Sequence, residues 1–166
     1  MPILTFHLLL GSNEGNREAH LLRALDALRA RAVVVGVSSV YETAPWGFQQ
    51  QPDFLNQAVE VIVESEPEAF MLQLKQMEKE AGRVAAPRWG PRVLDIDLLL
   101  AEDRIIHTSQ LIVPHPRLHE RRFALVPLAE IAPNAIHPLL GLSVSALLSR
   151  CTDPLPVRIV YPAHEV

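Results

Sequence analysis

The stretch RWGPRVLDIDLLL, residues 88–100, places two aspartates inside an apolar run that otherwise resembles a buried strand. We predict a strand over residues 93–100. Side chains two positions apart on a strand point to the same side of a sheet, so Asp95 and Asp97 project side by side. The other side faces the core with Leu94, Ile96 and Leu98. We therefore expect the acidic pair on the helix-free face of a sheet.

The segments before this strand complete a βαββαβ order of elements. Further strands are predicted at 3–10, 32–42 and 54–64, where β-branched and aliphatic residues concentrate. One helix is predicted from about 17 to 31 with Asn16 as N-cap, and a second one begins at Pro67 and ends at Gly82. This order predicts an α+β fold of the ferredoxin-like type, an antiparallel sheet with both helices on one face.

The sequence after residue 100 is rich in proline and predicts loops and short elements. Most of the 14 prolines of the chain follow residue 85. The pattern predicts short helices near 121–131 and 143–150 and a possible edge strand at 157–161.

Composition indicates an ordinary globular chain of 166 residues, 49% hydrophobic and 20% charged, which predicts one domain over 1–166. The net charge of −4 argues against a nucleic-acid or membrane partner. The single Cys151 excludes an internal disulfide and suits a reducing cytosol. The apolar start has neither a basic region nor a cleavage site, and no run reaches the roughly 20 residues of a spanning helix. We expect a cytoplasmic protein and a monomer.

The acidic pair itself needs a counter-charge. Two carboxylates 5–6 Å apart would repel by about 3 kcal/mol at an effective dielectric constant near 20. Mg²⁺ answers this need, because it takes one or two carboxylates together with phosphates and water. An Asp-x-Asp pair on a strand is weak evidence by itself, and an exposed pair or a pair that binds nearby arginines is the alternative.

Basic residues flank the pair on both sides and favour a phosphate ligand. Arginine presents a planar fork that matches phosphate oxygens. The basic residues before the pair are Arg83, Arg88 and Arg92, and those after it are His115, Arg117, His119, Arg121 and Arg122. Mg²⁺ with a nucleoside triphosphate fits this pattern. In the alternative, these arginines pair with Glu78, Glu80 and Glu120 on a solvated surface.

Three aromatic residues gather in and after a proline-bounded loop, in a chain with only 5% aromatics. They are Trp46, Phe48 and Phe54, and Asn56 shares a strand face with Phe54. Stacking with a neighbouring amide predicts a site for a flat heterocycle, whereas core packing is the alternative for these aromatics. The turn GSNEGN (11–16) matches neither a P-loop nor a dinucleotide-binding pattern and is interpreted as a tight turn capped by asparagine.

Taken together, these segments resemble the 6-hydroxymethyl-7,8-dihydropterin pyrophosphokinase family of the folate pathway. The resemblance runs from about residue 6 to 134. It rests on LLLGSNEGNR, SSVYETAPWG, QPDFLNQAV, EKEAGR, RWGPRVLDIDLLL and VPHPRLHERRFALVPLAEIAP. The resemblance implies transfer of pyrophosphate from ATP to the pterin's primary alcohol, which gives AMP and the pterin pyrophosphate.

The resemblance also implies roles for individual residues. Asp95 and Asp97 hold two Mg²⁺ ions, and Arg83, on a mobile loop, and Arg92 act with them in catalysis. The implied ATP-binding residues are Arg83, Arg88, Arg92, His115 and Arg121. The pterin lies between Phe54 and Phe123, with Asn56 at its edge and the backbone of Thr43, Ala44 and Trp46 beside it.

The residues alone leave two other functions open. One is a metal-dependent phosphohydrolase or nucleotidyltransferase that uses the same acidic pair. The other is a noncatalytic ligand-binding domain.

Overall fold

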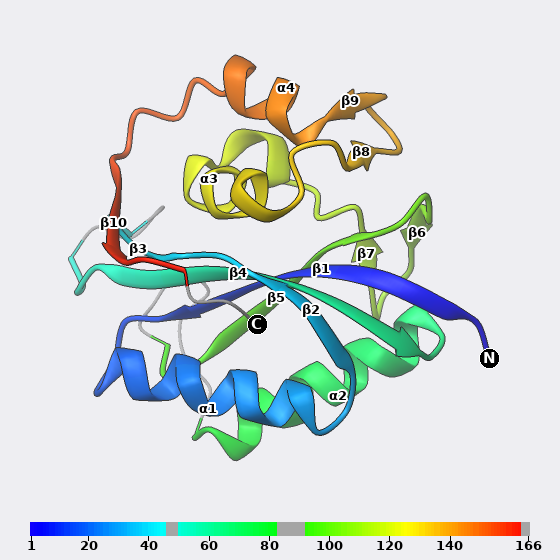
Figure 1. Ribbon diagram of the computed structural model, residues 1–166, viewed down its shortest axis with the longest axis horizontal. Coiled ribbons are helices and arrows are strands. Elements are labelled where there is room, and N and C mark those ends of the chain that lie inside the picture. The colour runs from blue at the N-terminus through cyan, green and yellow to red at the C-terminus, as the bar shows by residue number, and fades with distance from the viewer. Residues whose placement is uncertain (46–49, 83–91, 164–166) are drawn as a thin grey trace.

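The computed structural model describes residues 1–45, 50–82 and 92–163. Their central element is a six-stranded antiparallel sheet in the order β10-β3-β4-β1-β5, with β2 paired to β4 off this path (Figure 1). Its strands are β1 (Ile3–Ser12), β2 (Val33–Val37), β3 (Val40–Thr43), β4 (Phe54–Glu64), β5 (Asp95–Ala101) and β10 (Val157–Tyr161). The predicted α+β class and antiparallel sheet are confirmed.

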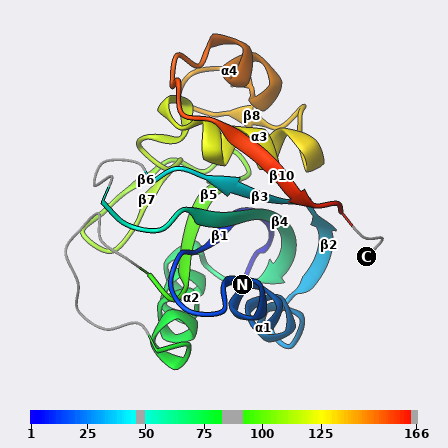
Figure 2. The ribbon, with the colours of Figure 1, turned by 90° about the vertical axis from the view of Figure 1, so that its left-hand side faces the viewer.

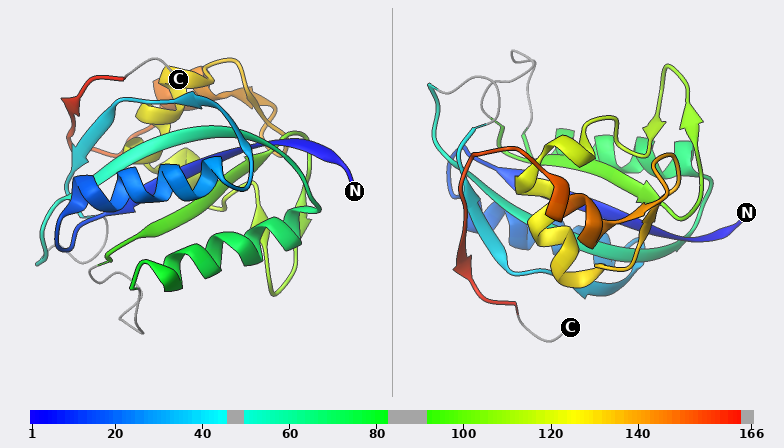
Figure 3. Two further views of the ribbon diagram at one scale, coloured as in Figure 1. Left: turned by 60° about the horizontal axis from the view of Figure 1, so that its bottom comes forward. Right: turned by 90° about the horizontal axis from the view of Figure 1, so that it is seen from above.

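Two helices, α1 (Arg17–Arg29) and α2 (Pro67–Glu80), lie side by side on one face of the sheet (Figure 3, left). Asn16 caps α1 as predicted, since its Oδ1 accepts the N–H of Ala19 at 3.1 Å. Alternate residues of the three central strands face these helices and form the larger hydrophobic cluster. Its fully buried members include Phe6, Leu8, Leu10, Val59, Phe70 and Leu74.

The opposite face is not helix-free, which corrects the expectation from sequence. The helix α3 (Arg122–Ile131) packs against it, and α4 (Val144–Arg150) lies over α3 (Figures 1 and 3). Leu9, Ala58 and Leu99 bury themselves under α3 in a second cluster with Leu125 and Leu128. The physical reason is that α3 has its own apolar side and needs a partner face.

The predicted strand 32–42 is two strands, β2 and β3, separated by Ser38 and Ser39. Ser38 Oγ accepts the N–H of Ala58 at 2.8 Å, and the Ser39 N–H and hydroxyl both donate to the Glu130 carboxylate. Serine side chains compete with ladder hydrogen bonds in this way. The break lets β2 and β3 both pair with β4.

The remaining elements are short and confirm the loop-rich second half. Two hairpins, β6 (Ile106–His107) with β7 (Ile112–Val113) and β8 (Ile136–His137) with β9 (Leu142–Ser143), accompany the 3₁₀ turn Leu118–Glu120. The predicted edge strand is confirmed, since β10 pairs with β3 at the edge of the sheet (Figure 2). Among the described helices, none combines the length and the apolarity that crossing a bilayer requires.

Candidate active site

Strand register brings the acidic pair and the amide of Asn56 to the same face of the sheet. Gly11 on β1 pairs with Asn56 on β4 and with Asp95 on β5. Paired residues point to the same side, so Asn56 and Asp95 face the same way about 10 Å apart, with Gly11 between them. Two residues back along β1 and on the same face, Leu9 lies between Ala58 and Asp97. The predicted heterocycle site and the predicted metal site are therefore neighbours.

Gly11 keeps this row open because it has no side chain. A Cβ atom at position 11 would lie 2.9 Å from Asn56 Oδ1 and 3.5 Å from Phe54 Cδ1. The first distance is too short for a carbon–oxygen contact, so any other residue would displace the Asn56 amide. The glycine thus leaves room for the side chains of Phe54 and Asn56 above the strand.

Asn56 and Thr43 are held together at the heterocycle end. Both residues are buried, and Asn56 Nδ2 donates to Thr43 Oγ1 at 2.6 Å. Thr43 pairs with Phe54 across β3 and β4, and Phe54 is half-buried. Ala44 follows β3 directly, whereas Trp46 and Phe48 lie outside the described residues. The described part of the predicted pterin site is therefore contiguous.

Arg121 lies close to both aspartates. Burial lowers the pKa of the Arg121 guanidinium, and Arg117 lowers it too, whereas the charges of Asp97 and Asp95 raise it. The residue is 8% exposed. The Arg121 guanidinium therefore lies near both predicted metal ligands, and the roles of the three residues stay predictions.

His115 lies beside the same arginine in an uncharged form. Its backbone N–H donates to Leu99 O at 2.9 Å, which holds it near β5 two residues after Asp97. Burial, followed by the charges of Arg121 and Arg117, lowers the pKa of His115 to about 4. The ring Nδ1 accepts the N–H of Arg117 at 3.2 Å, so at neutral pH the ring proton lies on Nε2. His115 can therefore donate a hydrogen bond to an anion without carrying a charge.

Phe123, at the start of α3, lies next to Arg121 on the phosphate side. The Arg121 guanidinium carbon lies 5.5 Å from the centroid of the Phe123 ring, within cation–π range. The segment after α4 holds this helix start in place. Asp153 Oδ2 accepts the N–H of Arg122 at 3.1 Å, and the Arg122 side chain donates to the carbonyls of Asp153 and Cys151.

The C-terminal strand anchors the β3 edge of the site as well. Arg158 on β10 and Arg17 on α1 both form ion pairs with the Glu42 carboxylate, one residue before Thr43. Arg17 Nη1 also donates to Asp53 O at 2.9 Å, directly before Phe54. Residues on both flanks of the predicted heterocycle loop are therefore held by one guanidinium.

Two predicted ATP ligands, Arg83 and Arg88, lie outside the described residues. Arg92 is described, and it is 8% exposed and three residues before Asp95. Its backbone N–H donates to Asn13 Oδ1 at 2.7 Å, and its carbonyl accepts the N–H of Asn13 at 3.0 Å. Sequence reasoning assigned only a turn to the segment that contains Asn13.

Glu78 on α2 was considered from the sequence only in the alternative, as a surface partner of the arginines. It is 6% exposed rather than on a solvated surface, and its Oε2 accepts the N–H of Ile96 at 2.7 Å. Ile96 lies between the two aspartates, so this buried carboxylate fixes the start of β5. Its position next to Met77 in the apolar stripe of α2 is the signal that could have indicated burial.

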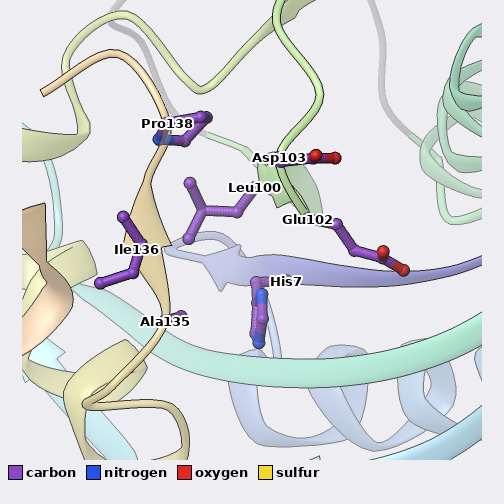
Figure 4. A pocket seen from close by; sticks show the side chains of 7 residues that line it. All are labelled: His7, Leu100, Glu102, Asp103, Ala135, Ile136 and Pro138. Carbon is purple, nitrogen blue, oxygen red and sulfur yellow. The ribbon is translucent and has the colours of Figure 1, made fainter. Parts of the chain in front are cut away.

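A separate cavity lies between the middle of β1, the end of β5 and the segment around β8 (Figure 4). It measures about 250 Å³ and is lined by His7, Leu100, Glu102, Asp103, Ala135, Ile136 and Pro138. Pockets that enclose drug-sized ligands measure about 300–1,000 Å³, so this cavity is too small for a nucleotide. No predicted site residue lines it.

The donor set of the acidic pair fits Mg²⁺. Among the residues that the structure describes, no three His, Cys, Asp or Glu side chains cluster as a metal site. Mg²⁺ commonly takes only one or two protein carboxylates and fills its octahedron with substrate phosphates and water. Asp95 and Asp97 provide two carboxylates on one face, next to cationic groups that attract phosphate.

Comparison with known proteins identifies the family. The family model described as 7,8-dihydro-6-hydroxymethylpterin-pyrophosphokinase (HPPK) matches residues 7–133. The chain is 44% identical over 135 residues to the 2-amino-4-hydroxy-6-hydroxymethyldihydropteridine pyrophosphokinase of Aquifex aeolicus, and the match covers 81% of this chain and 84% of the relative. It is 48% identical over 127 residues to the enzyme of the same name from Bacillus subtilis, with 75% and 76% covered.

A solved structure of a longer protein has the same fold. The Plasmodium falciparum HPPK-DHPS with pteroate superposes with a TM-score of 0.72 at 15% identity, over 90% of this chain. This chain spans 42% of that protein's solved chain. The family model and the curated relatives together establish that the chain belongs to the 7,8-dihydro-6-hydroxymethylpterin-pyrophosphokinases, enzymes of pyrophosphoryl transfer in folate biosynthesis.

Proposed function

We propose that the chain transfers a pyrophosphoryl group from ATP to the hydroxymethyl group of 6-hydroxymethyl-7,8-dihydropterin at the polar end of the sheet, and that AMP is the second product. The observation that carries the proposal is the row in which Gly11 separates Asn56 from Asp95 on one face. A heterocycle bound at Asn56 would direct a short substituent over Gly11 toward the carboxylates. The two substrates then meet at the centre of the site.

The heterocycle end would hold the pterin by stacking and by hydrogen bonds to its edge. Phe54 and Phe123 supply the aromatic faces, and Asn56 supplies the amide. Asn56 is already oriented by its hydrogen bond to Thr43, so little side-chain entropy is lost on binding. The backbone of Thr43 and Ala44 would add further contacts, and Trp46 is proposed from the sequence.

The phosphate end would hold the triphosphate of ATP between two basic segments. Arg121 and the Nε2–H of His115 would approach from the segment after β5, and Arg92 from the segment before it. Arg83 and Arg88 are proposed from the sequence. Because Arg121 is already buried beside Asp97 and Asp95, its guanidinium needs little reorganisation when an anion binds.

Asp95 and Asp97 would hold Mg²⁺, and two ions along the triphosphate are proposed. Bound Mg²⁺ supplies positive charge that neutralises the phosphate oxygens as charge shifts during transfer. The protein residues contribute position: the carboxylates, Arg92 and Arg121 fix the triphosphate, and Asn56 with the aromatic rings fixes the alcohol. Proximity of this kind contributes several kcal/mol to a two-substrate reaction.

The proposed reaction conserves each atom. The alcohol oxygen of the pterin forms a bond to the β-phosphorus of ATP. The bond from this phosphorus to the oxygen that bridges it to the α-phosphorus breaks, and this oxygen leaves with AMP. The alcohol loses its proton in the process. The β- and γ-phosphates remain joined on the pterin.

One product analysis tests the proposal. The protein is incubated with MgCl₂, ATP and the hydroxymethyl pterin, and nucleotide and pterin products are separated by ion-exchange chromatography. AMP and a pterin pyrophosphate in equal amounts, both dependent on the pterin, are expected. ADP, or loss of ATP without the pterin, would indicate a phosphohydrolase or another transferase, and binding without turnover would indicate a degenerate site.

We further propose that the reaction takes place in the cytoplasm. The proposed donor is ATP, and the single Cys151 suits a reducing compartment.

A further inference from the structure

We propose that Asn13 is a positioning residue that couples the two substrate subsites, so that a bound nucleotide tightens binding of the pterin and the reverse. The inference rests on the proposed function, because it takes the pterin to bind at Phe54 and the triphosphate at Arg92. Asn13 follows the last residue of β1 and is 1% exposed. The Asn13 side chain is uncharged, so it would act on the two subsites by holding their segments in position.

One arm of the coupling is the Asn13 amide nitrogen. Nδ2 donates to Gln51 Oε1 at 2.8 Å and to the carbonyl of Pro52 at 2.9 Å. Pro52 lies two residues before Phe54, so both hydrogens of the amide hold the segment that leads into the pterin end. A shift of this segment would therefore move Phe54 and alter the hydrogen bonds of Asn13 Nδ2.

The other arm reaches the phosphate end. Asn13 Oδ1 accepts the N–H of Arg92 at 2.7 Å, and the Asn13 N–H donates to the carbonyl of Arg92 at 3.0 Å. Both backbone groups of Arg92 are thus fixed by one residue. Arg92 lies three residues before Asp95, so this arm sets the approach to the proposed metal ligands.

Asparagine alone satisfies both arms. The orientation of its amide is fixed by backbone partners, because the Pro52 carbonyl can only accept and the Arg92 N–H can only donate. Aspartate has nearly the same shape and keeps an acceptor for Arg92, but it cannot donate to Gln51 or Pro52. It would also place a charge against two acceptor oxygens. Asn13→Asp therefore separates the two arms, leaving the Arg92 arm intact.

The test measures coupling rather than affinity for either substrate. The dissociation constant of the pterin is measured by calorimetry without nucleotide and with saturating Mg²⁺ and α,β-methylene-ATP, an analogue that cannot transfer pyrophosphate. The ratio of the two constants is the coupling factor. Coupling between sites typically amounts to about 5- to 150-fold. We expect a factor of at least about 5 in the wild-type chain and a factor near 1 in Asn13→Asp.

The matched control is Asn16→Asp, three residues along in the same turn. Asn16 caps α1 by accepting the N–H of Ala19, and aspartate fills that role equally well. This variant is expected to keep the wild-type coupling factor. Nucleotide affinity in the absence of pterin should stay within about twofold in Asn13→Asp, because the Arg92 arm remains.

A second pair of variants serves if Asn13→Asp does not fold. Gln51→Glu keeps an acceptor for Asn13 Nδ2, whereas Gln51→Met removes it with little change in shape. The coupling factor should fall in Gln51→Met and persist in Gln51→Glu. Equal factors in these two variants, an unchanged factor in folded Asn13→Asp, or no coupling in an active wild-type chain would each overturn the inference. A wild-type chain that binds both substrates but makes no AMP would instead overturn the proposed function.

Discussion

The two ends of one sheet face differ sharply, although the same strands run through both. At one end, Leu9, Ala58 and Leu99 lie buried under α3. Two residues along each strand, the same face carries Gly11 and Asn56 on β1 and β4, and Asp97 on β5. The reverse side of these strands is mainly apolar and packs against α1 and α2, with Leu4, Phe6, Leu8 and Leu10 of β1 in the larger hydrophobic cluster. One face of each strand thus packs against α1 and α2, and part of the opposite face packs under α3. The rest of that opposite face is left for polar site residues.

The largest effect on activity is expected from a substitution at the polar end of this face. Asp97→Ala should lower the rate of AMP formation at least about 1,000-fold, which is about 4 kcal/mol of transition-state stabilisation, because it removes a proposed metal ligand. The free energy of unfolding should change by no more than about 1 kcal/mol, since the side chain is only half-buried. Steady-state kinetics and urea denaturation measure the two quantities.

Asp103→Ala is the control, because Asp103 is an exposed aspartate in the turn just after β5, close to the other end of the strand. Its rate should stay within about twofold of wild type. A wild-type rate in Asp97→Ala would contradict the proposed metal role.

The neighbouring residue should behave in the opposite way. Ile96 points to the α1 and α2 side and is 2% exposed. Ile96→Ala should lower the free energy of unfolding by about 2–5 kcal/mol through the cavity it leaves. The folded fraction should keep most of its activity. A loss below about 1 kcal/mol in urea denaturation would mean that the apolar face does not anchor β5 as described.

Lowering the pH should affect the polar end through His115. Its pKa is near 4 in the folded chain and 6.5 when unfolded, so below pH 6.5 the unfolded chain binds more protons at this residue. The free energy of unfolding therefore decreases as the pH falls from 6.5 to about 4, by up to about 3 kcal/mol from this residue.

Two measurements check this prediction. The stability difference between the wild-type chain and His115→Asn, which has no titrating ring, should change over that pH range. The ring resonance of His115, assigned by its absence from the variant, should titrate near pH 4. A midpoint near the ordinary histidine value of 6.5 would show that Arg121 and burial do not act on the ring as described.

The smallest expected effect concerns the glycine between the two subsites. Gly11→Ala places a methyl group against Asn56 Oδ1 and should raise the KM for the pterin about 10-fold, roughly 1.4 kcal/mol, with a smaller change in the KM for ATP. Gly36→Ala on β2 is the control, since a Cβ atom there meets its nearest neighbour at 3.5 Å, an ordinary contact. Equal pterin KM values in the two variants would contradict the crowding at Gly11.

Sequence reasoning succeeded where a local pattern determines the structure. The strands predicted at 54–64 and 157–161 match β4 and β10, and the two-residue period of a strand put Asp95 and Asp97 on one face. It could not foresee that α3 covers part of this face, because the partner of an apolar helix side is chosen by tertiary packing. The break at Ser38 and Ser39 was missed for a similar reason, since their hydroxyls bond to residues distant in sequence.

The sequence suggested individual candidate residues for the site but not how they are arranged relative to one another. Motifs proposed Asn56, Asp95, Arg121 and His115 as site residues, but only the register of β1 with β4 and β5 shows that Asn56 and Asp95 lie on either side of Gly11 on one face. Asn13 carries no signal of its own in sequence. Its importance comes from partners at 51, 52 and 92, and no periodicity links those positions.

The bonds from Asp153 to the start of α3, and from Arg158 to Glu42, have a consequence for the order in which a ribosome makes this chain. Every proposed substrate contact precedes residue 124, yet the helix that carries Phe123 and the strand that carries Thr43 are each fastened by residues made later. A nascent polypeptide halted before Asp153 could already fold its sheet against α1 and α2. The proposed substrate contacts of Thr43 and Phe123 would be held in place only after translation of the last strand.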